Sequence, residues 1–75
     1  MERGESFDFQ ALKSKIEANY SNINSFAEKI PMSYVALNNK LDNKMEFTIK
    51  EIIKIVELLD IKPNEITYYF FTHIV

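Results

Sequence analysis

Apolar residues recur at spacings of three and four along most of this chain, which is the period of one face of an α-helix. Phe9, Leu12, Ile16 and Tyr20 show the pattern in the first third of the sequence. One Gly and two Pro in 75 residues are too few for many tight turns, which favours helices over a turn-rich all-β fold. The sequence therefore predicts an all-α fold, and its length leaves room for a single small domain.

Capping residues mark where the first three of five expected helices begin. Asp8 is placed to cap the first helix, and Asn22 offers the cap of the second, over residues 23–30. Pro31 ends that helix because proline lacks the N–H that the helical ladder needs. Ser33 caps the third helix, which runs to about Leu41 on its buried side.

The fourth helix carries the strongest local signal. Thr48 and Glu51 have the spacing of a capping box, in which each side chain accepts a hydrogen bond from the backbone N–H of the other. A wide apolar stripe follows, and it predicts that this helix is the central and most buried one. The stripe contains Ile49, Ile52, Ile53, Val56 and Leu59, broadened by Ile55 and Leu58. Pro63 suits the first turn of a fifth helix.

The two ends of the chain differ from the middle in composition. Residues 1–7 are mostly polar and predict a flexible N-terminal tail, ahead of a domain over residues 8–71. Residues 72–75 are β-prone and compatible with a short extended C-terminal tail. No apolar run approaches the ~20 residues that span a bilayer, and no signal peptide opens the chain. We therefore expect a cytoplasmic protein without membrane contact.

Composition and charge exclude several function classes. The chain has no Cys and one His, which excludes disulfides, thiolate chemistry and a multi-histidine metal cage. We expect no cofactor, metal or small-molecule ligand, and no enzyme, because capping explains Glu51 and solvation explains Glu57. The net charge of −2 excludes a strongly basic nucleic-acid binder. Only positions 38–50 are net positive, by one charge, since Lys40, Lys44 and Lys50 face two acidic residues there.

A helix-turn-helix is predicted within SFAEKIPMSYVALNNKL, where two short helices are joined by about three residues. Ala27 is small enough for the second helix to cross the third at close range. Leu37 falls on the inner side of the third helix, where it can cover Ala27. Met32 is expected to fill the turn, and Ser33 to set the starting angle of the third helix.

These residues resemble the Cro/repressor-type (XRE-like) helix-turn-helix family, and most closely the small Cro-like regulators of phages and prophages of Gram-positive bacteria. The resemblance runs from about Phe7 to Phe71 and rests on FAEKI-P-MSYVALNNKLDNK, FTIKEIIKIVELLDI and KPNEITYYFF. It implies a five-helix, lambda-repressor-like bundle that places its third helix in the DNA major groove, usually as a dimer on paired half-sites. Family members usually have Gly at the position of Pro31 and many have Gln at that of Ile23. Because proline fixes φ near −65°, we expect the turn to take a different path or the second helix to end early.

The resemblance also implies which side chains meet DNA. The expected base-reading residues point outward from the third helix: Tyr34, Val35, Asn38 and Asn39. Asn bonds an adenine edge through two atoms, and Val meets a thymine methyl. The expected phosphate contacts are Asn22, Asn24, Ser33, Lys40, Asn43 and Lys44, which set register rather than sequence preference. Plain solvation of Asn38 and Asn39, and sideways packing of Tyr34 against the second helix, stay open as alternatives.

The aromatic run 68–71 cannot all face inward, because consecutive residues on a helix are 100° apart. We expect Tyr68 or Phe71, with Ile74 and Val75, to form a self-association surface, and His73 to have a surface or interface role. The leading hypothesis is a homodimeric repressor that binds a double-stranded DNA operator, on the nucleoid when bound, and blocks a promoter. The alternative is a protein-interaction module, such as an antirepressor that docks on another regulator.

Overall fold

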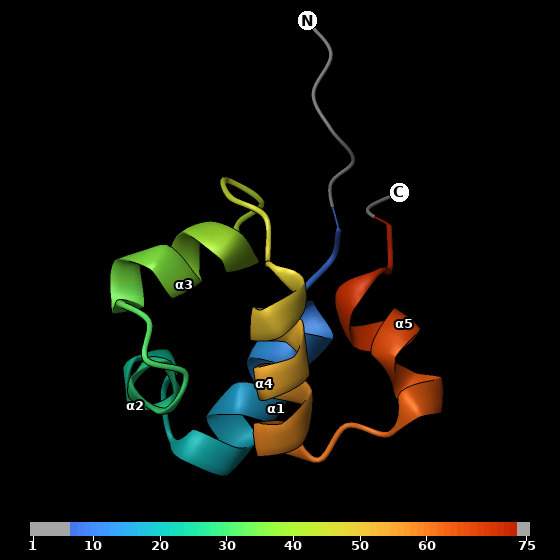
Figure 1. Cartoon of the computed structure of the whole chain (residues 1–75), viewed down its shortest axis with the longest axis horizontal. Helices are drawn as coiled ribbons and strands as arrows, with labels where there is room; N and C mark the ends of the chain where they lie inside the picture. Colours follow the sequence, from blue (N-terminus) through green and yellow to red (C-terminus); the bar gives the residue numbers. More distant parts are fainter. Residues whose placement is uncertain (1–6, 74–75) are drawn as a thin grey trace, which may run out of the picture.

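Five α-helices and one short 3₁₀ helix make up the part of the chain that the computed structural model describes, residues 7–73. In order they are α1 (Gln10–Tyr20), α2 (Ile23–Lys29), α3 (Tyr34–Leu41), α4 (Ile49–Leu59), the 3₁₀ helix η1 (Pro63–Glu65) and α5 (Ile66–Phe70). No β-strand occurs within residues 7–73. The predicted all-α, five-helix bundle is confirmed (Figure 1). The proposed division at residues 7 and 71 stays a prediction, and most of the expected N-terminal tail lies outside the described residues.

Three of the helices, α2, α3 and α4, begin where the capping residues indicate. The capping box at the start of α4 is complete: Thr48 N donates to Glu51 Oε1 at 2.9 Å, and Glu51 N donates to Thr48 Oγ1 at 3.1 Å. At the start of α1 the expected cap is displaced by one residue. Phe9 is the backbone cap, and Asp8 Oδ1 accepts from Gln10 N at 2.9 Å. Asp8 therefore still satisfies one of the free N–H groups of the first turn.

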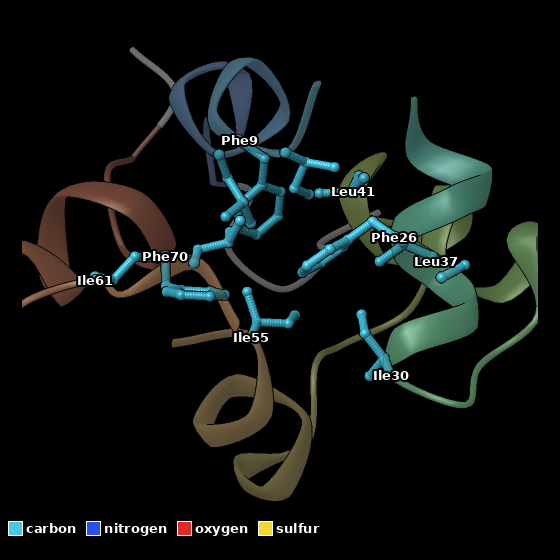
Figure 2. Packing of buried hydrophobic residues seen from close by; sticks show 12 residues of the cluster. Phe9, Phe26, Ile30, Leu37, Leu41, Ile55, Ile61 and Phe70 are labelled. Atoms are coloured by element: carbon cyan, nitrogen blue, oxygen red, sulfur yellow. The ribbon is translucent and has the colours of Figure 1, made fainter. Parts of the chain in front are cut away.

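One apolar core joins all five helices. α1 packs against α2, α4 and α5, and α2 packs against α3. Figure 2 shows Phe9, Phe26, Ile55 and Phe70 converging from different parts of the chain on one interior. The twelve buried apolar residues are Phe9, Leu12, Ile16, Phe26, Ala27, Ile30, Leu37, Leu41, Ile55, Leu59, Ile61 and Phe70. Leu37 and Leu41 belong to this core and hold α3 against the body of the protein.

α4 is less buried than its apolar stripe predicts. Ile55 and Leu59 are buried, but Ile49 is 72% exposed and Ile53 is 53% exposed. The stripe covers more than half of the helix circumference, and four neighbouring helices of five to eleven residues do not cover that width. The expectation that α4 is the most buried helix is therefore wrong, and an apolar strip of its surface faces solvent.

The two ends of the described chain lie side by side. Phe7 and His73 form an isolated antiparallel bridge, and Asp8 N donates to Thr72 O at 2.7 Å. The Phe7 ring also meets the Phe71 ring edge-on, with 5.7 Å between ring centroids. The segment after α5 is thus extended at Thr72 and His73, while residues 74–75 lie outside the described residues.

Three helices end with the same backbone reversal, in which one residue takes a positive φ and the next N–H reaches back to a carbonyl five residues earlier. Asn43 and Asp60 have φ values of 65° and 54° after α3 and α4. After each of these helices both bonds of the motif form: one from the N–H of the positive-φ residue and one from the residue that follows it. Asn and Asp tolerate this region better than other residues with a side chain.

The third of these reversals carries Pro31, where the sequence suggests a different path. Pro31 has a φ of 25°, about 90° from the value that its ring favours. Met32 N still donates to Ala27 O at 3.1 Å, so the turn closes as after the other two helices. The second bond of the motif is missing because proline has no N–H. Of the two expected outcomes, a different path is wrong, because the chain keeps the positive-φ turn at the cost of backbone strain. The other fits, since α2 ends at Lys29, one residue short of the expected range 23–30.

Candidate functional site

The helix-turn-helix is assembled as the sequence predicts. α2 and α3 pack against each other, with Ala27 1% exposed and Leu37 fully buried between them and the core. Met32 is half-buried against the same cluster. α3 lies at the edge of the molecule, beside α2 and away from α5 (Figure 1). One side of α3 is therefore held by the core and the opposite side faces solvent.

Side-chain caps set where both helices of this unit start. Asn22 Oδ1 accepts from Ser25 N at 2.8 Å, and Ser33 Oγ accepts from Ala36 N at 3.0 Å. Each cap uses an acceptor atom and leaves a donor over: the Asn22 amide N–H₂ group and the Ser33 hydroxyl proton. No hydrogen bond from either donor forms within residues 7–73. Donors at these positions have the polarity that a phosphate oxygen requires.

The four expected base-reading residues share the solvent side of α3 but differ in exposure. Tyr34 is 47% exposed and Val35 is 65% exposed. Asn38 and Asn39 are half-buried, and neither side-chain amide hydrogen-bonds within the described chain. Both amides therefore keep a donor and an acceptor for a ligand. Their role in binding DNA stays a prediction.

A shallow hollow of about 410 Å³ lies where α1, α2 and α3 meet, lined by Glu17, Asn22, Ile23, Asn24 and Tyr34. It brings together three of the side chains that the sequence assigns to DNA contact, Asn22, Asn24 and Tyr34. Sequence reasoning missed Glu17 because it lies on the preceding helix, outside the helix-turn-helix. Its carboxylate repels any phosphate that enters this hollow.

Lys40 is the first expected phosphate contact that the structure reassigns. Its side chain is only 7% exposed, and Nζ donates to both carboxylate oxygens of Glu51, at 2.6 and 2.7 Å. An ammonium group held in this way has no free side toward solvent, so Lys40 is not a phosphate contact. Lys40 is three residues after Leu37 and so lies only about 60° from it around α3. This closeness to the inward side is the signal that could have indicated burial.

The carboxyl group of Glu51, the ion-pair partner of Lys40, has a lowered pKa. Burial works to raise the pKa of Glu51, but the Lys40 and Thr48 hydrogen bonds and the Lys40 charge outweigh it and lower the pKa below the ordinary 4.5. Glu51 thus has two structural tasks: it completes the capping box of α4 and ties α4 to α3. This ion pair fixes the C-terminal end of α3 to the body of the protein.

Asn43 is the second expected phosphate contact with a structural task. Its Oδ1 accepts from Phe7 N at 2.9 Å, and its Nδ2 donates to Phe7 O at 2.8 Å. Both ends of the amide therefore hold the N-terminal segment against the loop after α3, and the role of Asn43 as a phosphate contact stays a prediction. Lys44, next to it, is exposed and stays available.

The exposed charge near α3 is small. Between residues 22 and 50, Lys29, Lys44 and Lys50 are exposed, as are Glu28, Asp42 and Glu46. Asp42 pairs with Lys13 of α1 at 3.5 Å, and the other five take part in no ion pair within residues 7–73. Three lysines against two glutamates leave one excess positive charge. A single protomer therefore offers little of the salt-dependent attraction that drives non-specific DNA binding.

The expected self-association residues are accessible where they are described. Tyr68 is 60% exposed and Phe71 is 44% exposed, which confirms that the aromatic run does not all face inward. Ile74 and Val75 lie outside the described residues. Dimer formation through these four residues stays a prediction.

Comparison with known proteins identifies the family. A family model described as "Protein of unknown function (DUF739)" matches residues 5–73, and the chain belongs to this family. The solution structure of the modulator of repression (MOR) of the temperate bacteriophage TP901-1 from Lactococcus lactis is similar to this chain, with a TM-score of 0.76 and 32% sequence identity. The match covers 88% of this chain and 89% of the phage protein. No curated protein matches. Within residues 7–73, no helix has the length and apolar character to cross a membrane.

Proposed function

We propose that this chain is a small phage-type transcription regulator that binds double-stranded operator DNA through the solvent side of α3, as a homodimer in the cytoplasm. The observation that carries the proposal is the helix-turn-helix itself. Ala27 and Leu37 close the contact between α2 and α3, and the opposite side of α3 keeps two unbonded amides. The proposal includes no catalytic step and no cofactor, because promoter occupancy alone blocks polymerase.

In this proposal the surviving site residues divide into two roles. Asn38 and Asn39 read base edges, with Val35 against a thymine methyl and Tyr34 along the sugar-phosphate backbone. The phosphate contacts are Asn22, Asn24, Ser33 and Lys44. Because the exposed charge is small, affinity has to come from two protomers on paired half-sites rather than from one protomer alone.

The experiment measures how replacement of single asparagines changes the affinity for a cognate and for an unrelated duplex, by fluorescence anisotropy. Asn39→Ala is expected to lower affinity for the cognate site by roughly 1–3 kcal/mol and to leave non-specific binding nearly unchanged. Asn64→Ala is the matched control, because Asn64 is exposed in η1, across the molecule from α3 (Figure 1). Equal losses on both duplexes would remove Asn39 from the base-reading residues.

Two observations favour a second candidate function, which also uses the solvent side of α3. The chain is 32% identical to a phage modulator of repression, and Glu17 opposes phosphate at the edge of the α3 surface. We infer as the alternative that the protein docks on another regulator, with exposed Tyr34 and Val35 as apolar contacts. Retention on heparin at low salt separates the two candidates: the DNA-binding proposal predicts retention, and the docking alternative predicts none.

A further inference from the structure

α4 presents an apolar strip that none of the roles above uses. Ile49 and Ile53 are four residues apart and therefore adjacent on one side of the helix, with 72% and 53% of their surfaces exposed. Val56 continues the same side and is half-buried. We call Ile49, Ile53 and Val56 the α4 strip. Neighbouring exposed isoleucines are uncommon on a surface that stays in contact with water.

The charges beside the α4 strip are arranged so that they complement themselves. At 100° per residue, Lys50 and Glu57 lie on the same flank of the strip, near opposite ends of the helix, and both are exposed. Lys54 is turned further round, away from the strip. No ion pair within residues 7–73 engages Lys50 or Glu57.

A second α4 packed antiparallel, with a two-fold axis at Ile53, superposes these features. The axis brings the same flank of both helices together, so Lys50 of one copy meets Glu57 of the other, twice. Lys50 lies three residues before Ile53 and Glu57 four residues after it. At 1.5 Å per residue, the two charges are thus offset by only about 1.5 Å along the helix axis. A parallel pairing puts Lys50 and Glu57 against the uncharged flank of the partner and forms neither ion pair.

We propose that this protein self-associates through antiparallel packing of α4 on α4 of a second copy, with the α4 strips in contact and two Lys50–Glu57 ion pairs at the rim. This interface is separate from the C-terminal residues 68–75 and does not depend on DNA binding. A helix of 11 residues is about 16 Å long. The contact is therefore small by the standard of stable dimers, and the association is concentration-dependent rather than permanent.

Sedimentation equilibrium of the full chain, up to millimolar concentration and without DNA, tests the proposal. The unaltered chain is expected to show a reversible monomer–dimer equilibrium. Ile53→Glu is expected to weaken it by about tenfold or more, because it puts a carboxylate at the two-fold axis. Met45→Glu is the matched control, because it makes the same kind of change at an exposed apolar residue in the loop after α3, and it is expected to leave the equilibrium unchanged. Tyr68→Ala reports separately on the expected C-terminal contact. A monomer at all concentrations, or a dimer that Tyr68→Ala disrupts and Ile53→Glu does not, would overturn the proposal.

Charge reversal then tests the antiparallel register. Lys50→Glu and Glu57→Lys are each expected to weaken self-association, whereas a mixture of the two variants, or the double variant, recovers it. Lys54→Glu makes the same charge change on the side turned away from the strip and is the matched control. Thermal melts by circular dichroism verify that each variant stays folded. If the double variant folds but self-associates no more strongly than either single variant, this register is excluded.

Discussion

Replacement of Pro31 by glycine should make this protein more stable. The opposite is usual, because proline restricts the unfolded chain and so favours the folded state. Asn43 and Asp60 show what the reversal after a helix requires: a residue at positive φ whose N–H also bonds back into the helix. Pro31 supplies neither, since its ring opposes a φ of 25° and it has no N–H. Glycine supplies both without steric cost.

The expected gain follows from three contributions. Relief of the backbone strain is worth about 1–3 kcal/mol, and a restored bond to the solvated Glu28 carbonyl adds about 0.5–1 kcal/mol. Glycine also makes the unfolded chain more flexible, which costs about 0.5–1 kcal/mol. The net expectation for Pro31→Gly is a free energy of unfolding higher by about 1–3 kcal/mol. For a domain of this size, that raises Tm by roughly 5–20 °C.

Calorimetry and urea titration of the full chain measure this change. Pro63→Gly is the matched control, because the other proline begins η1, where a fixed negative φ suits the helical start. That control is expected to lose stability by up to about 1 kcal/mol. If Pro31→Gly lowers Tm as much as the control does, the argument from strain at the turn is refuted.

Three further predictions concern charge. Lys40→Ala should lower the free energy of unfolding by about 1–3 kcal/mol, measured by urea titration, because it strips a buried partner from Glu51. Since the folded state lowers the pKa of Glu51 below 4.5, its stabilising contribution is present above that pH and is lost as pH falls through the lower folded value. Tm against pH should therefore fall less steeply below pH 4.5 in Lys40→Ala than in the unaltered chain, and parallel curves would contradict the linkage. Glu17→Gln should strengthen binding to every duplex by a few fold in anisotropy titrations, and no change would take the α1–α2–α3 hollow out of the DNA contact.

Much of the fold could be predicted from short-range patterns in the sequence. The capping box at Thr48 and the caps at Asn22 and Ser33 each join residues three positions apart. Such patterns are visible in a single sequence because the interacting groups are neighbours along the chain. The helix order and the assembly of the helix-turn-helix follow from them.

The sequence was a poorer guide where distant residues decide. Lys40 meets Glu51 across eleven positions, and Asn43 meets Phe7 across thirty-six, so neither contact leaves a local pattern. Both residues are polar and close to α3, which makes them resemble DNA contacts until their partners are known. The stripe on α4 shows the same limit, because periodicity gives the width of an apolar face but not how much of it the rest of the chain covers.

Selection of bound sites from random duplex DNA shows whether the solvent side of α3 recognises a DNA sequence. The full chain is expected to enrich a two-fold symmetric motif, and Asn39→Ala is expected to lose the preference at one position of each half-site. Recovery of only unenriched sequences, at protein concentrations where self-association is complete, would contradict DNA recognition by this protein.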